Sequence, residues 1–204
     1  MCAGPTVEFW LERYRNRQTG WDRGGASPQL LAWLDADLLA PPARIVVPGC
    51  GAGWEVAELA ARGFAVTALD YAAEAVSRTR ELLQARGLTA RVEQADVLAW
   101  RLEEPFDAIY EQTCLCALHP DHWIAYADIL HRWLKPGGSL FALFMQALKP
   151  EAAVGFVSGP PYHCDIHGMR ALFDAARWEW EKPPFPILGH PNGGQEIAVR
   201  LRSR

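Results

Sequence analysis

The sequence predicts an α/β fold with a doubly wound, mostly parallel seven-stranded sheet behind an N-terminal helical cap. Two observations carry this prediction. Short apolar segments alternate with helix-length amphipathic segments from about residue 45 to residue 145. A glycine-rich turn follows the first of these short segments, and an acidic residue ends the second. Strands separated by single helices form parallel sheets with right-handed crossovers.

The N-terminal part is expected to contain two helices. Residues 6–17 place several apolar side chains near one another on a helix, with charged side chains elsewhere. Ser27-Pro28 marks the start of the second helix, because serine is a favoured N-cap and proline a favoured first helical residue. That helix is expected to end before Pro41-Pro42.

The remaining elements follow from the same reasoning. Strands are expected at 45–47, 64–69, 90–94, 106–110, 139–145, 177–181 and 195–201. Helices are expected at 54–62, 72–86, 121–134 and 166–176. Four prolines within 183–191 predict a rigid loop between the last two strands, and the chain shows no internal repeat.

Composition narrows the class of function. The 204 residues carry a formal net charge of −4, and the basic residues are scattered among acidic ones. Because phosphate neutralisation supplies much of the affinity for nucleic acids, we expect a small-molecule partner and no nucleic acid. The five cysteines have no paired spacing and are expected to be reduced thiols. The N-terminus lacks signal-peptide character, and residues 140–148 are too short to span a bilayer, so we expect a cytoplasmic protein without a membrane partner. No large exposed apolar seam demands a partner chain, so we expect a monomer.

The most informative motif is the glycine turn at 45–53, IVVPGCGAG, where a strand runs into the start of a helix. Glycine permits a tight bend and a close approach of the main chain to a ligand. Asp70 stands at the end of the second strand, where a carboxylate can accept hydrogen bonds from a ribose diol. Together they predict a nucleoside-containing cofactor. The alternative is a turn that only satisfies loop geometry.

The residue after this turn helps to choose the cofactor. The dinucleotide fingerprint needs a further glycine at position 54, where this chain has Trp54. A bulky indole there would obstruct close packing of the helix on the sheet, so a pyrophosphate site is disfavoured. S-adenosylmethionine has no phosphate and needs a glycine turn and a ribose-binding acid. It is the cofactor we expect.

From these residues outward the chain resembles class I S-adenosylmethionine methyltransferases. More narrowly, it is similar to the thiopurine methyltransferase superfamily, on the branch with halide and thiol methyltransferases. The resemblance runs from Phe9 to about Gly168. It rests on an ordered set of motifs: FWLERY, TGWDRG, VPGCGAG, ALDY, ADVLAW, FDAIYEQTCLCALHP, LKPGG and GPPYHCD. Because the proline-rich link is a rigid loop and not a domain boundary, we expect one domain over 1–204, with a cap (1–40), a cofactor-binding core (41–145), and an acceptor loop with C-terminal strands (146–204).

The resemblance also implies a set of cofactor-binding residues. They are Trp10, Tyr14, Trp21, Gly49, Gly51, Asp70, Asp96, Val97, Glu111 and Gln112. The three aromatic residues would cover the cofactor, whose cationic sulfonium is attracted to aromatic faces. The alternative is that they pack only on the core. The glycines would approach the methionine part, together with the two residues that end the fourth strand, and Asp70 would hold the ribose. The two residues after the third strand would contact the adenine.

Two residues are expected near the methyl acceptor. Tyr162 matches the tyrosine of the family's GPPY motif, and its hydroxyl would orient a thiol or an anion. His119 would assist deprotonation of a weakly acidic acceptor, although a histidine bonded locally before Pro120 is an equal alternative. Thiols and halides need little acid–base help, because a thiol is partly ionised near neutral pH. No cysteine and histidine set has the spacing of a known metal site, so no metal is expected.

Other functions remain open at this point. A methyltransferase acting on a different small acceptor would share every cofactor motif, since one scaffold carries many chemistries. A nicotinamide-dependent oxidoreductase would share the fold, although Trp54 argues against it. A binding module that retains the pocket without turnover is the third alternative.

Overall fold

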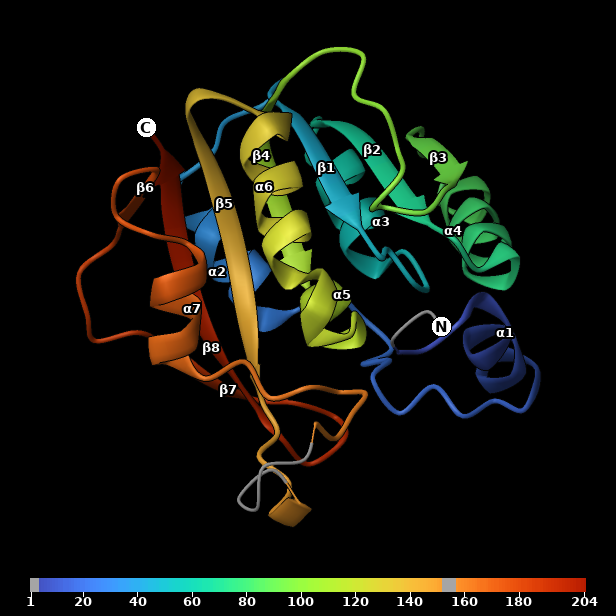
Figure 1. Ribbon diagram of the computed structural model, residues 1–204. Coiled ribbons are helices and arrows are strands. Elements are labelled where there is room, and N and C mark those ends of the chain that lie inside the picture. The colour runs from blue at the N-terminus through green and yellow to red at the C-terminus, as the bar shows by residue number, and fades with distance from the viewer. Residues whose placement is uncertain (1–3, 152–156) are drawn as a thin grey trace.

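The computed structural model describes residues 4–151 and 157–204, so Cys2 and residues 152–156 of the acceptor loop lie outside the described residues. Its strands form one eight-stranded sheet in the order β3-β2-β1-β4-β5-β8-β6, with β7 paired to β8 (Figure 1). The strands are β1 (Arg44–Pro48), β2 (Ala65–Asp70), β3 (Arg91–Gln94), β4 (Phe106–Gln112), β5 (Leu134–Gln146), β6 (Trp178–Trp180), β7 (Ile187–Gly189) and β8 (Gln195–Ser203).

The sheet is parallel from β3 to β5, whereas β8 runs antiparallel to β5, β6 and β7. This confirms the doubly wound, mostly parallel sheet. The expected number of seven strands was wrong, because residues 187–189 also pair with β8 and make eight. The chain moves outward from β1 through β2 to β3 and then returns to β4 on the other side of β1. The order therefore reverses between β1 and β4. In open α/β sheets, ligands bind beyond the carboxyl ends of the strands at such a switch point.

Helices cover both faces of the sheet (Figure 1). They are α1 (Val7–Arg15), α2 (Pro28–Asp35), α3 (Trp54–Ala61), α4 (Ala73–Ala85), α5 (Cys114–Ala117), the short 3₁₀ helix η1 (Pro120–His122), α6 (Trp123–Trp133) and α7 (Ile166–Leu172). Side chains of α2, α3 and α4 share one buried apolar cluster with the sheet, and those of α5, α6 and α7 share another. Each face of the sheet is thereby removed from water, which is the main stabilising contribution in such a fold.

The two N-terminal helices have different roles. The start of α2 is as expected, because the Ser27 hydroxyl accepts a hydrogen bond from the amide of Gln29, and Pro28 follows. Trp33 of α2 then packs against Phe141 of β5, with ring centroids 5.1 Å apart. Thus α2 belongs to the layer that covers the sheet. Within residues 1–40, the cap over the cavity consists of α1 and the loop that follows it.

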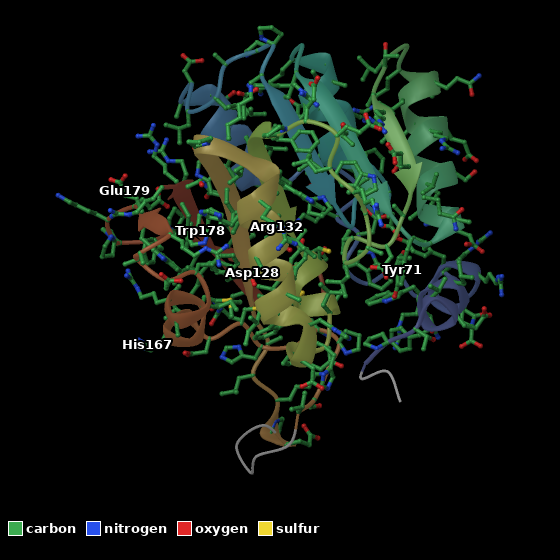
Figure 2. All side chains as sticks on the ribbon, turned by 45° about the horizontal axis from the view of Figure 1, so that its top comes forward. Tyr71, Asp128, Arg132, His167, Trp178 and Glu179 are labelled. Carbon is green, nitrogen blue, oxygen red and sulfur yellow. The ribbon has the colours of Figure 1, made fainter. Side chains whose placement is uncertain are left out.

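Two segments differ from expectation, one near the C-terminus and one after β4. Residues 187–189, inside the proline-rich link, form β7, because the link runs alongside β8 and hydrogen-bonds to it. Residues 114–117 form the short helix α5, in a stretch for which no helix was expected. Figure 2 shows that the β6 residues Trp178 and Glu179 mark one side of the molecule, while Tyr71, after β2, lies toward α1.

Among the described residues, no helix combines the length and apolar character needed to cross a membrane.

Candidate active site

A cavity of about 790 Å³ opens at the carboxyl ends of the parallel strands. Its volume lies within the range of roughly 300–1,000 Å³ that is usual for small-molecule and cofactor sites. The wall is built from α1 and the loop after it, from the turns after β1 to β4, and from the loops after β5 and β7. Of the residues expected at a cofactor or acceptor, ten line it: Trp10, Tyr14, Trp21, Gly49, Gly51, Asp70, Asp96, Val97, Gln112 and His119.

The glycine turn has the conformation that its sequence predicted. Gly49, Gly51 and Gly53 all have positive φ, at 62°, 55° and 79°. Side chains other than glycine rarely adopt this region. At Gly53 a Cβ atom would also stand 2.6 Å from the hydroxyl oxygen of Thr79 on α4. Gly53 therefore permits close packing of α3 on α4. It directly precedes Trp54, the residue that replaces the further glycine of the dinucleotide motif.

Trp54 begins α3 and faces the loop that follows α1. Its indole N–H donates a 2.8 Å hydrogen bond to Asp22 Oδ1, and the same oxygen accepts from the amide of Gly24. Trp54 lines the cavity. The indole thus connects the cap to the cofactor turn, a role that the comparison with dinucleotide motifs did not indicate.

Asp70 connects two turns at the floor of the cavity. Its Oδ2 accepts a 3.0 Å hydrogen bond from the Gly51 amide, and its Oδ1 accepts a 2.9 Å bond from the Ala72 amide. Burial raises the pKa of this carboxyl group, and these backbone amides oppose the shift. Two carboxylate oxygens offer about four lone pairs, so each oxygen retains capacity for another donor. The side chain is therefore fixed in place and still able to bind a diol.

The aromatic residues of the cap form one cluster over the cavity. Trp21 packs edge-on against Trp10 and Tyr14, with ring centroids 5.4 and 5.7 Å apart. Tyr14 is buried, and its neighbours in the core are Ala72 and Ala75 at the start of α4. The expected proximity of Trp10 and Tyr14 on one helical face is confirmed. Because all three rings also line the cavity, they can serve as both core and roof.

The turn after β3 supplies the wall at the other side of Asp70. Asp96 Oδ1 accepts a 2.9 Å hydrogen bond from the Leu98 amide, which orients the carboxylate. Val97 is buried against the core but also lines the cavity. An acidic and an apolar side chain therefore stand side by side, as expected for a group that contacts a purine ring.

Glu111 and Gln112 do not share one environment. Successive side chains of a strand point to opposite faces, and only Gln112 lines the cavity. Glu111 is 2% exposed and accepts a 2.6 Å hydrogen bond from the Leu115 amide at the start of α5. Burial raises its pKa to about 7. The expectation that Glu111 lies beside the cofactor is not supported by this position, where it caps a helix.

The two acceptor candidates are neighbours but differ in access to the cavity. The rings of His119 and Tyr162 meet edge-on, with centroids 5.4 Å apart, and His119 lines the cavity. The Nδ1 atom of His119 accepts from the Asp121 amide at 3.3 Å, which is the local bonding considered as the alternative. Tyr162 is buried beneath Gly159 and is absent from the cavity wall, which Pro160 and Pro161 reach instead.

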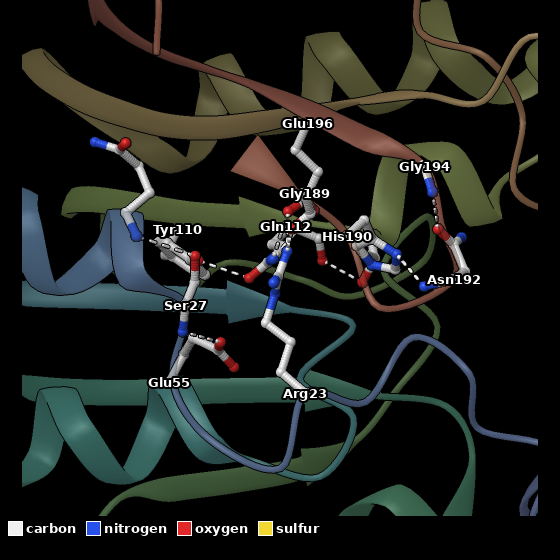
Figure 3. A network of polar contacts seen from close by, with 12 residues as sticks. Arg23, Ser27, Glu55, Tyr110, Gln112, Gly189, His190, Asn192, Gly194 and Glu196 are labelled. Carbon is white, nitrogen blue, oxygen red and sulfur yellow. Dashed lines mark hydrogen bonds and ion pairs between the residues drawn. The ribbon is translucent and has the colours of Figure 1, made fainter. Parts of the chain in front are cut away.

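A polar network at the far end of the cavity was not expected. Glu196 of β8 is fully buried and accepts hydrogen bonds from Arg23 at 2.7 Å and from Gln112 at 3.0 Å (Figure 3). The Tyr110 hydroxyl donates a 2.7 Å hydrogen bond to the Oε1 atom of Gln112. Glu55 accepts from the Ser27 amide, and burial raises its pKa to about 6. Arg23 and Glu196 are 173 positions apart, and no local pattern signals such a pair.

Metal binding finds no support among the described residues. None of their His, Cys, Asp and Glu side chains gather in a group of three or more that could hold an ion. Cys50, Cys114, Cys116 and Cys164 are free and buried. Burial raises the thiol pKa at each of these positions, so all four remain protonated at neutral pH.

Comparisons with known proteins agree with this geometry. The family model for thiopurine S-methyltransferase matches residues 5–183. Thiocyanate methyltransferase 1 of Arabidopsis thaliana is 32% identical over 162 residues, covering 77% of this chain and 67% of that protein. A thiopurine S-methyltransferase of Legionella pneumophila is 27% identical over 169 residues, covering 76% and 74%.

A solved structure shows the same fold. The 1,6-didemethyltoxoflavin-N1-methyltransferase of Burkholderia thailandensis, with S-adenosylhomocysteine bound, superposes with a TM-score of 0.76. It is 21% identical, and the match covers 97% of this chain and 86% of that one. The protein described here is an S-adenosylmethionine-dependent methyltransferase and belongs to the thiopurine S-methyltransferase family.

Proposed function

We propose that this protein methylates a small soft nucleophile, such as a thiol, a halide, a thiopurine or a chalcogen species. The observation that carries the proposal is the cavity itself: one opening combines the glycine turn, the fixed carboxylate of Asp70 and an aromatic roof. The names of the relatives, which include thiocyanate, thiol and thiopurine methyltransferases, support the same acceptor class. We further propose a single-domain, cytoplasmic monomer that does not bind nucleic acid.

Within the cavity we assign roles by chemistry. S-adenosylmethionine, when bound, supplies a methyl group activated by a sulfonium centre. Asp70 would accept hydrogen bonds from its ribose, and Asp96 with Val97 would contact its adenine. Gly49, Gly51 and Gln112 would lie beside its methionine part.

The cap would act on the reacting centre. Trp10, Tyr14 and Trp21 would shield the sulfonium from water and attract its charge. Methyl transfer to a soft nucleophile needs alignment of nucleophile, methyl group and leaving sulfur more than it needs proton transfer. His119 lines the cavity, and it would assist deprotonation of a weakly acidic acceptor once the Asp121 amide releases Nδ1, the ring nitrogen that can take up a proton. Tyr162 would act by holding the His119 ring, since its own side chain does not line the cavity.

The test is methylation of a panel of acceptors, with product detection by mass spectrometry. We expect methylated product from at least one thiol, halide or thiopurine, only in the presence of S-adenosylmethionine. Calorimetry without an acceptor separates binding from turnover. Binding without any product would favour a module that holds the cofactor without catalysis. If S-adenosylmethionine does not bind at submillimolar concentration, the assignment of the cavity is refuted.

A further inference from the structure

Two residues of the cavity wall each carry a buried side-chain nitrogen that has no hydrogen-bond partner. Among the described residues, six buried side-chain nitrogen or oxygen atoms make no hydrogen bond, and only Arg23 Nε and His190 Nε2 belong to residues of the cavity wall. Buried polar atoms in native proteins are nearly always hydrogen-bonded. Two exceptions in residues that line one cavity therefore mark a polar requirement at this place that the folded chain alone does not meet.

The bonding of His190 shows that its free nitrogen is a donor. The residue is 6% exposed and occupies the turn between β7 and β8, where its amide donates to the Gly194 carbonyl at 2.8 Å. Its Nδ1 accepts from the Asn192 amide at 3.3 Å, so Nδ1 carries no proton. Burial lowers the pKa of His190, which keeps the ring neutral at pH 7. A neutral ring with a bare Nδ1 holds its proton on Nε2.

Arg23 brings the second donor to the same corner. Its Nη2 donates to the Glu196 carboxylate at 2.7 Å and to the Gly189 carbonyl at 2.8 Å. Gly189 directly precedes His190, so this bond brings Arg23 next to His190. Figure 3 shows the side chains of Arg23 and His190 near Glu196. The guanidinium Nε–H can only donate. The corner thus holds two N–H groups, from different parts of the chain, that lack an acceptor within the folded chain.

The charges around this corner disfavour an anion. The Arg23 guanidinium is already paired with Glu196, whose side chain is fully buried. The Glu55 carboxylate also lies close enough for its pKa to be affected by both Glu196 and Arg23. Two carboxylates therefore surround one guanidinium. An additional negative charge would meet net repulsion in a medium that screens it poorly.

The corner lies at the acceptor end of the cavity. Asp70 and Asp96 follow β2 and β3, on one side of β1, whereas Gln112 and Glu196 belong to β4 and β8 on the other side. A cofactor whose ribose and adenine lie at β2 and β3 would present its methyl group toward β4. Cys116, Met145 and Pro160 complete an apolar wall at this end.

We infer that Arg23 and His190 form a specificity-determining subsite that binds a neutral hydrogen-bond-accepting group on the methyl acceptor, beside its nucleophilic atom. The substrate class is thus a small polar thiol or related molecule that carries a carbonyl, ether or ring-nitrogen acceptor, as opposed to a bare halide. This inference rests on the proposed function and narrows it.

Three thiols of similar size provide the test. Methyl thioglycolate carries a neutral carbonyl, 1-butanethiol carries no polar group, and thioglycolate carries a carboxylate. Each is assayed as acceptor with wild-type protein and with His190→Phe, and the ratio of the two kcat/KM values is compared between thiols. Differences in thiol acidity cancel in this ratio. His190→Gln restores a side-chain N–H, and His163→Phe is the matched control, because His163 also has an unpartnered ring nitrogen but does not line the cavity.

We expect His190→Phe to lower kcat/KM for methyl thioglycolate about fivefold to tenfold, mainly through KM, as for one lost hydrogen bond. The value for 1-butanethiol should change little, and thioglycolate should be the poorest acceptor. His190→Gln should recover most of the loss, and His163→Phe should match wild type. Affinity for S-adenosylmethionine checks that the variants fold.

Two results overturn the inference. One is an equal effect of His190→Phe on methyl thioglycolate and 1-butanethiol, and the other is a preference for thioglycolate. If none of the three thiols is methylated although S-adenosylmethionine binds, the proposed function is contradicted instead. The subsite is then tested separately by calorimetric binding of each thiol to the complex with S-adenosylhomocysteine. The ¹⁵N chemical shifts of His190 report directly whether Nε2 carries the proton and gains an acceptor.

Discussion

Glu111→Gln should stabilise the protein, and more so at higher pH. The carboxyl group has a pKa of about 7 in the fold against 4.5 as the ordinary value, because burial disfavours its charged form. A raised pKa contributes stability that is complete below pH 4.5 and is lost as pH rises through 7. Each pKa unit corresponds to about 1.4 kcal/mol, so the raised pKa costs on the order of 3 kcal/mol of stability at pH 8. At pH 5 the cost is about 1 kcal/mol, because the group is protonated in the fold but already partly ionised in the unfolded chain. The glutamine carbonyl still accepts from the Leu115 amide.

Thermal unfolding of wild type and variant between pH 5 and pH 8 measures this effect. For a chain of this size, about 3 kcal/mol corresponds to an increase in Tm of roughly 6–12 °C at pH 8. Exposed Glu12→Gln is the control and should leave Tm nearly unchanged at every pH. Affinity for S-adenosylmethionine should also be unchanged, because Glu111 does not line the cavity. A Tm gain that does not grow with pH, or a large loss of cofactor affinity, would refute the reasoning.

Three further predictions concern the cavity and its cap. Asp70→Asn should weaken S-adenosylmethionine binding at least tenfold by calorimetry, since an amide cannot accept on both sides; unchanged affinity would contradict its role. Trp10→Leu should weaken binding of S-adenosylmethionine about threefold more than that of uncharged S-adenosylhomocysteine; equal losses would mean that the ring only packs. Arg23→Ala should destabilise the fold by about 3 kcal/mol in urea unfolding, because Glu196 is left buried and unpaired. The exposed-pair variant Arg15→Ala should cost less than about 1 kcal/mol, and similar costs for the two would contradict the argument.

Local signals predicted the part of the site that local geometry determines. The bend at Gly49 and Gly51 needs positive φ, which only glycine adopts readily, so the sequence shows it directly. Asp70 was identifiable because it ends a strand of clear β character and parallel strands bring their carboxyl ends together. The spacing of Trp10 and Tyr14 likewise placed both side chains on one helical face.

The rest depends on contacts that no local pattern encodes. The side of the strand on which Glu111 lies is set by the register of β4 between β1 and β5, so its neighbour Gln112 alone reaches the cavity. The strand at 187–189 forms only because β8 is available for pairing. Arg23 and His190 lie in loops whose sequences show no motif, and only the folded chain brings these two residues to one corner of the cavity.

The position of Glu196 bears on the order of events during folding. This residue belongs to β8, yet it holds Gln112 on β4 and Arg23 in the cap. The cap therefore has its buried anchor only after β8 has paired with β5. During synthesis the glycine turn and Asp70 emerge well before β8, and the pocket they belong to stays open until β8 is added. Competence for methyl transfer should consequently appear in one late step.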